Sequence, residues 1–177
     1  MADRLTRSPW PLRVALALFV LASGFAGWAG LEWRGAAADE TVSYAATRDE
    51  VERIGREHVA VLTTLDYHDV DAGIERWLTV STGALHDELA ATDAATRQTL
   101  RDNATVSTGR VLDAAVSELD TRTGTAKMLV SVEISSARDG APPTSKRNRF
   151  VAAMVAEGDG WKLSALDQVR LGGEDGS

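Results

Sequence analysis

The chain has 177 residues and a hydrophobic fraction of 44%, enough for one globular domain with a buried core and an appendage. Acidic side chains outnumber basic ones by 26 to 19, and the excess lies downstream of Asp39, which argues against nucleic-acid or anionic-lipid binding by that part. The absence of cysteine excludes disulfides, thiolate metal sites and cysteine nucleophiles.

The N-terminal segment predicts one membrane-spanning helix. Residues 14–31 contain no charged side chain and as a helix would span about 27 Å, close to the thickness of a bilayer core. Residues 1–13 carry three arginines, which favour the cytoplasmic side. We therefore expect a single-pass plasma-membrane protein with residues 1–13 in the cytoplasm, a transmembrane helix over 14–31, a juxtamembrane segment over 32–46 and the remainder outside.

A cleaved signal peptide is the alternative for the same segment. Residues 36–38 are all alanine and match a small-residue cleavage site after a basic region. The apolar run over 14–31 is longer than that of a typical signal peptide, and Trp33 and Arg34 separate it from the alanines. We favour the anchor, and both alternatives export the remainder.

Helical periodicity follows, to about residue 101. Thr47 and Glu50 have capping-box spacing, which predicts the start of a first helix. Its apolar positions recur at helical intervals: Val51, Ile54, His58, Leu62 and Leu65. The polar segment from Asp66 to Asp71 ends this helix, and Asp71 is expected to cap a second one. The second helix has the apolar stripe Ile74, Trp77 and Leu78, and a third, over 84–101, turns Leu85, Leu89 and Leu100 inward.

The pattern changes to a period of two after Asn103. Residues 126–134 alternate, with Ala126, Met128, Val130, Val132 and Ile134 on one face. Residues 150–156 and 161–166 are predicted to form a hairpin around the turn at 157–160. Residues 106–116 form a weaker strand interrupted at Gly109 and Arg110, and 136–146 form a mobile loop.

These elements predict an α+β domain over residues 47–170. Helices followed by strands imply a four-stranded antiparallel meander with the first helix packed across a curved sheet. The remaining residues, 171–177, are expected to be disordered.

The densest polar cluster consists of residue types that bind metals: Asp66, His68, Asp69 and Asp71. A solvated turn with Asp71 as helix cap explains the cluster more simply. The residues from His86 to Glu88 are interpreted as a charged helix surface. We therefore assign no metal-binding residue.

Three other side chains are candidates for chemistry. His58 lies on the apolar stripe of the first helix, as a packed core residue or, in a cone-shaped fold, as a general base. Glu133 and Asp113 are the carboxylates on predicted strands, and alternation places Glu133 on the face opposite Met128. No serine lies in a nucleophile-elbow motif. We therefore assign no catalytic or cofactor-binding residue and no cofactor, and we expect no enzymatic activity.

Trp161 is interpreted as a core anchor.

The layout also carries a family resemblance. A predicted transmembrane helix precedes helices and strands, with Thr82-Gly83 and its acidic followers in the middle and Gly160-Trp161 opening the last strand. This layout resembles the Mce-associated membrane proteins of actinobacteria, accessory proteins of mammalian-cell-entry lipid transport systems. The resemblance implies an external domain with the NTF2-like, or cystatin-like, cone fold, which is shared with ketosteroid isomerases and with an inner-membrane assembly factor of type IV secretion.

The same resemblance implies a function. It indicates a non-enzymatic accessory or assembly subunit of a cell-envelope lipid transport complex of the Mce type, with the protein components of that transporter as partners. The alternative is a membrane-tethered enzyme or small-ligand-binding protein that uses the pocket of the cone. A cone filled with side chains, with apolar patches on its outside, would favour the assembly subunit. An acidic side chain or histidine that points inward beside an open cavity would favour the enzyme or ligand-binding protein.

Overall fold

The structure is a computed structural model, and residues 42–158 and 160–169 are described. The chain divides into two units, Met1–Ala45 and Ala46–Ser177, and the fold below is that of the second. Within the described ranges no helix has the length and apolar character to cross a membrane. The predicted segments 1–13, 14–31 and 171–177 lie outside these ranges, as does most of 32–46.

The first described helix covers residues 42–62. It is already helical upstream of Thr47, so the predicted capping-box start is wrong, because residues 42–46 contain no helix breaker and the helix runs through them. Val51 and Val59 are completely buried, and Ile54 and Leu62 pack against the core, which confirms a buried face. Leu65 lies beyond the helix, in a strand.

The break after this helix contains two short elements, β1 (Leu65–Asp66) and a 3₁₀ helix, η1 (Tyr67–Asp69), before α2 (Val70–Val80). The prediction that Asp71 caps the second helix is wrong. The helix begins at Val70, directly after η1, so Asp71 lies in its first turn. The carboxylate that does act as a cap is Asp66, which accepts a hydrogen bond from the His68 amide at 2.9 Å at the start of η1.

The single helix predicted over 84–101 is two helices, α3 (Gly83–Ala90) and α4 (Ala94–Asp102). Asp93 explains the break, because its side chain accepts a hydrogen bond from the Thr96 amide at 2.7 Å and so caps a new helix. An aspartate within a polar stretch is a typical helix N-cap, so Asp93 was the signal of this break in the sequence.

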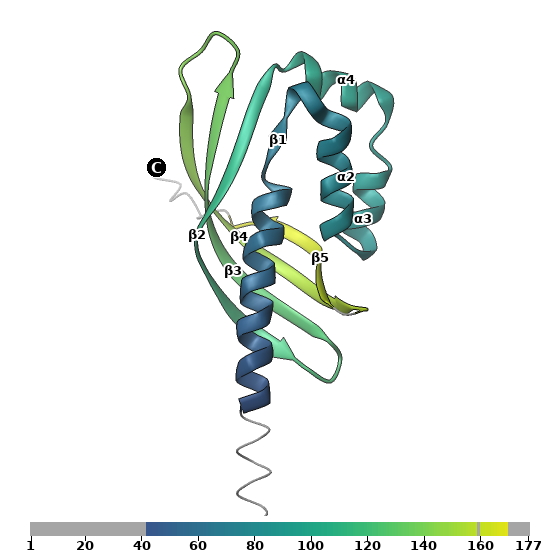
Figure 1. Ribbon diagram of the computed structural model, residues 1–177, viewed down its shortest axis with the longest axis vertical. Helices are drawn as coiled ribbons and strands as arrows, with labels where there is room; N and C mark the ends of the chain where they lie inside the picture. Colours follow the sequence, from purple (N-terminus) through teal and green to yellow (C-terminus); the bar gives the residue numbers. More distant parts are fainter. Residues whose placement is uncertain (1–41, 159, 170–177) are drawn as a thin grey trace, which may run out of the picture. The chain divides into compact units, whose positions relative to one another are not determined.

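The strands form one antiparallel sheet in the order β1-β2-β3-β4-β5. Its long strands are β2 (Thr105–Asp120), β3 (Thr125–Arg138), β4 (Thr144–Glu157) and β5 (Gly160–Gln168). The α+β class and the helix-on-sheet layout are confirmed, but the sheet has five strands rather than four because Leu65 and Asp66 pair with Ser107 and Val106. The helices α2, α3 and α4 form a group beside β5 (Figure 1).

Two strand boundaries also differ from the prediction. β2 is continuous through Gly109 and Arg110, and its irregularities lie further along, between Val111 and Asp113 and between Val116 and Glu118. The loop predicted over 136–146 shrinks to 139–143, because Ser136 pairs with Thr144 across the β3–β4 hairpin. Backbone pairing with a neighbouring strand extends these polar ends, which carry no alternating apolar signal.

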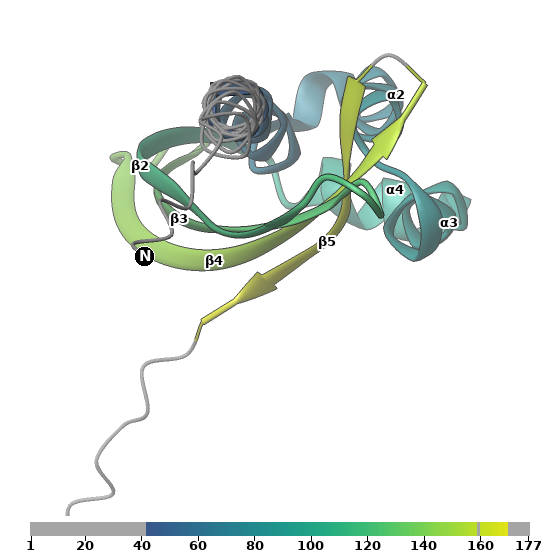
Figure 2. The ribbon, with the colours of Figure 1, turned by 90° about the horizontal axis from the view of Figure 1, so that it is seen from below.

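The core lies between the 42–62 helix and the sheet, which curves around that helix (Figure 2). On β3, Ala126, Met128, Val130 and Val132 are buried, as the alternation predicted. A Cβ at Gly55 would meet the side-chain sulfur atoms of Met128 and Met154, so glycine allows the helix to approach the sheet closely. The turn at 157–160 closes the predicted hairpin, with Glu157 paired to Gly160.

Candidate docking surface

The inner face of the sheet is packed with side chains. Met128, Val132, Met154 and Leu163 point toward the 42–62 helix and expose at most 1% of their surface. A reactive pocket in a cone fold would need space on this side for a substrate beside a polar group. At these four positions the helix and the sheet occupy that space themselves.

His58 is the inward candidate that the sequence singled out. It is half-buried on the 42–62 helix, and its Nδ1 atom is buried without a hydrogen-bond partner among the described residues. Burial lowers the pKa of His58, an effect that Glu57 opposes and Lys162 reinforces. The lowered pKa favours the neutral ring, and no carboxylate among the described residues accepts a hydrogen bond from it, whereas the histidine of a catalytic triad is oriented by such a carboxylate.

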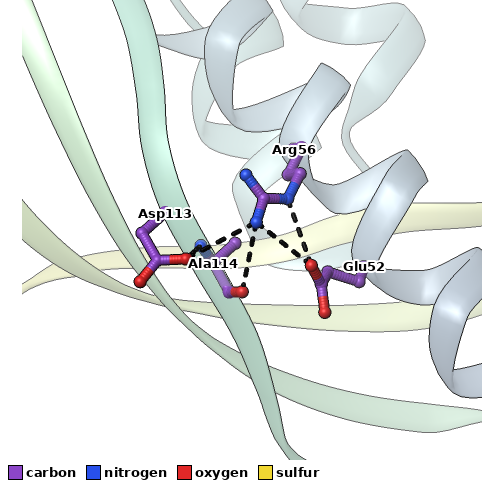
Figure 3. Close-up of polar contacts among 4 residues, drawn as sticks. All are labelled: Glu52, Arg56, Asp113 and Ala114. Carbon is purple, nitrogen blue, oxygen red and sulfur yellow. Dashed lines mark hydrogen bonds and ion pairs between the residues drawn. The ribbon is translucent and has the colours of Figure 1, made fainter.

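The two strand carboxylates are both paired with arginine. Glu133 lies on the outer face, as predicted, 2.7 Å from Arg110 and 3.9 Å from Arg147. The hydrogen bond from Arg110 is the main reason that the pKa of Glu133 is lowered. Asp113 lies 3.6 Å from Arg56 (Figure 3). Neither carboxylate points into the core, so neither is placed for proton transfer at an inner pocket.

Figure 3 shows how Arg56 joins the helix to β2. Its guanidinium donates to Glu52 at 3.1 and 3.2 Å on its own helix and to the carbonyl oxygen of Ala114 at 3.4 Å on the strand. Asp113, next to Ala114, completes the group. This cluster ties the 42–62 helix to β2.

The polar cluster at 66–71 separates into two structural contacts. The Asp66 carboxylate lies 2.7 Å from Nδ1 of His68, while Asp71 pairs with Arg97 at 2.9 Å and Arg101 at 2.6 Å and so joins α2 to α4. On α3, His86 lies 3.8 Å from its neighbour Asp87. No group of three histidine, aspartate or glutamate side chains within 42–158 and 160–169 is arranged to hold a metal ion.

The outer face of the sheet carries apolar side chains that the described elements leave exposed. Ala115, Leu129 and Val151 are aligned across β2, β3 and β4. Leu129 is 53% exposed, and Val169, just after β5, is 39% exposed. Ala115, Leu129 and Val169 contribute to the central hollow, which has a volume of about 310 Å³ on this face. A second hollow of about 250 Å³ includes Lys127.

Charged side chains surround the central hollow unevenly. Arg149 lines it, and its guanidinium forms no hydrogen bond or ion pair with any other described residue. In the next row of the sheet, Arg110 and Arg147 share the single carboxylate of Glu133. Asp113 also lines the hollow, so the positive charge belongs to Arg149 and to the neighbouring row of Arg110 and Arg147, in a chain with a net charge of −7.

The sequence carries one signal of this surface, which the predicted elements did not use. Leu129 lies in the outward phase of β3, between Lys127 and Ser131, where a polar residue is expected. An apolar residue in the polar phase of a strand is an early sign of an uncovered contact face.

Comparison with known proteins gives structural neighbours. No family model matches the chain, and no curated protein sequence is detectably similar to it. Solved structures do match. An IcmL-like type IV secretion system protein from Legionella pneumophila aligns over 71% of this chain and 94% of its own, with a TM-score of 0.58 and 10% identity.

Two further structures give the same result. The periplasmic domain of DotI covers 67% of this chain and 92% of its own, with a TM-score of 0.56 and 8% identity. CagV from Helicobacter pylori is a VirB8 homologue of a type IV secretion system. It covers 70% of this chain and 99% of its own, with a TM-score of 0.53 and 8% identity. At these identities the likeness concerns the fold alone, helices packed on an antiparallel sheet.

The resemblance to Mce-associated proteins is contradicted by these neighbours, which are type IV secretion proteins. The two phrases that carried it are structural: Thr82 precedes α3, and Gly160 and Trp161 open β5. They also meet, because the Thr82 amide donates to the carbonyl oxygen of Leu163 at 2.8 Å. Such motifs belong to a contact within the fold and do not distinguish families that share the fold. The predicted membership of the actinobacterial Mce-associated family and the predicted role in Mce-type lipid transport are therefore wrong. The chain is similar in fold to two type IV secretion system proteins and to the periplasmic domain of DotI.

Proposed function

We propose that this chain is a non-enzymatic structural subunit of a multiprotein transport assembly in the cell envelope, of the kind to which VirB8-like and DotI-like proteins belong. Its domain over residues 47–170 works outside the cytoplasm, and residues 14–31 anchor it in the membrane. Support comes from the fold shared with an IcmL-like secretion protein and with the periplasmic domain of DotI.

One observation carries the non-enzymatic part of this proposal. The sheet packs its inner face against the 42–62 helix and exposes apolar side chains, Leu129 above all, on its outer face. Exposed apolar groups on a well-packed domain are typical of interaction surfaces. An assembly subunit needs such a surface, whereas an enzyme of this fold needs space on the inner side.

The experiment compares assembly with activity in the source cell. Affinity purification of the full chain from native membranes, with mass spectrometry, identifies the complex. Deleting the gene is expected to lower the level of that complex, and His58→Ala and Glu133→Ala variants are expected to restore both the complex and transport. Loss of transport in either folded variant, with the complex at its normal level, would show that chemistry or ligand binding was overlooked.

The location is tested separately with reporters fused after Ser177. An alkaline-phosphatase fusion is expected to be active and a reporter that works only in the cytoplasm to be silent. The opposite pattern contradicts an extracytoplasmic domain.

A further inference from the structure

The central hollow on the outer face has the size and lining of a side-chain receptor. Its volume of about 310 Å³ is at the lower end of the range of about 300–1,000 Å³ for small-molecule pockets. Leu129, Ala115 and Val169 provide apolar lining, and Leu129 keeps about half of its surface exposed. This space suits one or two apolar side chains better than a large lipid.

The charges at the hollow favour a carboxylate beside those apolar groups. Asp113 is the carboxylate that lines the hollow, and it is drawn toward Arg56, 3.6 Å away (Figure 3). Arg149 has no partner among the described residues. A guanidinium binds a carboxylate with paired hydrogen bonds, and a neighbouring apolar surface reduces competition from water.

We propose that this hollow docks an acidic segment of a partner protein, with a large apolar side chain resting on Leu129 and a nearby carboxylate bound by Arg149. The inference rests on the proposed assembly role and specifies the chemistry of the partner. Arg110 and Arg147, one row away, extend the positive side for further acidic residues. A small contact of this kind is weak alone, and confinement of both proteins to a membrane plane raises their effective concentration.

The test uses the purified full chain and a random peptide library displayed on phage. Selected peptides are synthesised and titrated by fluorescence anisotropy against the wild-type chain and two variants, Leu129→Asp and Arg149→Glu. Arg122→Glu is the matched control, because it makes the same charge change in the turn between β2 and β3, away from the hollow. Circular dichroism establishes that each variant is folded.

The expected result is a selection of peptides that combine large apolar residues with aspartate or glutamate. Arg149→Glu weakens their binding about tenfold or more, as for the loss of a charge-assisted hydrogen bond. Leu129→Asp weakens binding similarly, and Arg122→Glu leaves it unchanged. Repeating the selection on Arg149→Glu is expected to shift the peptides toward basic residues.

Three results of the work with the purified chain would overturn the proposal. These are a selection without acidic enrichment, binding that neither variant weakens, and self-association abolished by Leu129→Asp, which would make a second copy of the chain the occupant. The assembly role is judged independently, by the level of the complex in cells. A Leu129→Asp chain that assembles normally would remove this docking site and leave the proposed function standing.

Discussion

Trp161 is the largest side chain in the buried core and belongs to the hairpin of β4 and β5. It is 7% exposed and lies opposite Ala156. We predict that Trp161→Ala lowers the free energy of unfolding by about 3–5 kcal/mol, because it removes a large buried ring and leaves a cavity. Urea denaturation followed by circular dichroism measures this loss, and Trp161→Phe should lose less. A Trp161→Ala domain with wild-type stability would contradict the core role.

Ser81 is a polar residue in the buried interior of the domain. Its side chain is 1% exposed, between α2 and α3, and its Oγ makes no hydrogen bond with the described residues. A buried unsatisfied hydroxyl costs stability, so Ser81→Ala is expected to leave the free energy of unfolding unchanged or to raise it by about 1 kcal/mol.

Thr64→Val provides the opposite control for Ser81. The Thr64 hydroxyl donates to the carbonyl oxygen of Ala60 at 2.7 Å and accepts from the Gly109 amide at 3.0 Å, so its removal should cost about 1 kcal/mol or more. Thermal unfolding of both variants compares them directly. If Ser81→Ala loses as much stability as Thr64→Val, the Ser81 hydroxyl must have a partner such as a buried water.

At the scale of elements, the end of the 42–62 helix lies against β2 at Gly109. A Cβ at this position would overlap the side chain of Thr63 and come within 3.3 Å of its backbone carbonyl carbon. Gly109→Ala is therefore expected to push the two elements apart and to lower the free energy of unfolding by about 1–3 kcal/mol.

Gly160→Ala is the matched control for Gly109, because a Cβ at Gly160 would meet nothing within 4 Å. Chemical denaturation should give the Gly109→Ala variant a clearly lower free energy of unfolding than the wild type. The Gly160→Ala variant should have a free energy of unfolding close to that of the wild type. Equal stability of the two variants would mean that Thr63 moves aside without cost and that this contact does not hold the helix in place.

For the whole molecule, the pKa directions predict stability that falls toward acid pH in two stages. Burial lowers the pKa of His58 from 6.5, so below about that pH the unfolded state binds the proton more readily. Hydrogen bonds from Arg97 and Arg110 lower the pKa of Asp71 and Glu133 from 3.8 and 4.5. Their stabilising charge is present above these values and is lost as they protonate at lower pH.

The free energy of unfolding, measured by urea denaturation from pH 8 to pH 3, separates the two stages. His58→Gln is expected to flatten the curve just below pH 6.5 and to leave the steeper fall at lower pH unchanged. An unchanged slope below pH 6.5 in this variant would show that His58 is not the group that links protonation to unfolding there.

The sequence by itself determined the features carried by neighbours along the chain. The period of two over 126–134 correctly placed Met128 inward and Glu133 outward, and the turn at 157–160 correctly predicted the last hairpin. Alternation and turn chemistry act between adjacent residues, so they can be recognised without the fold. The class of fold followed from the order of these local elements.

Only the tertiary structure decided what depends on partners distant in sequence. β1, the uninterrupted β2 and the long ends of β3 and β4 form because backbone groups of polar residues pair across strands, and periodicity does not record such pairing. Two short sequence motifs also could not identify the family, because they lie at a contact between α3 and β5 that belongs to the fold itself. The outer-face hollow exists because Leu129, Val169 and Arg149 come from three separate segments and no described element covers them, a relation that is set when the strands align and the helix takes the other side.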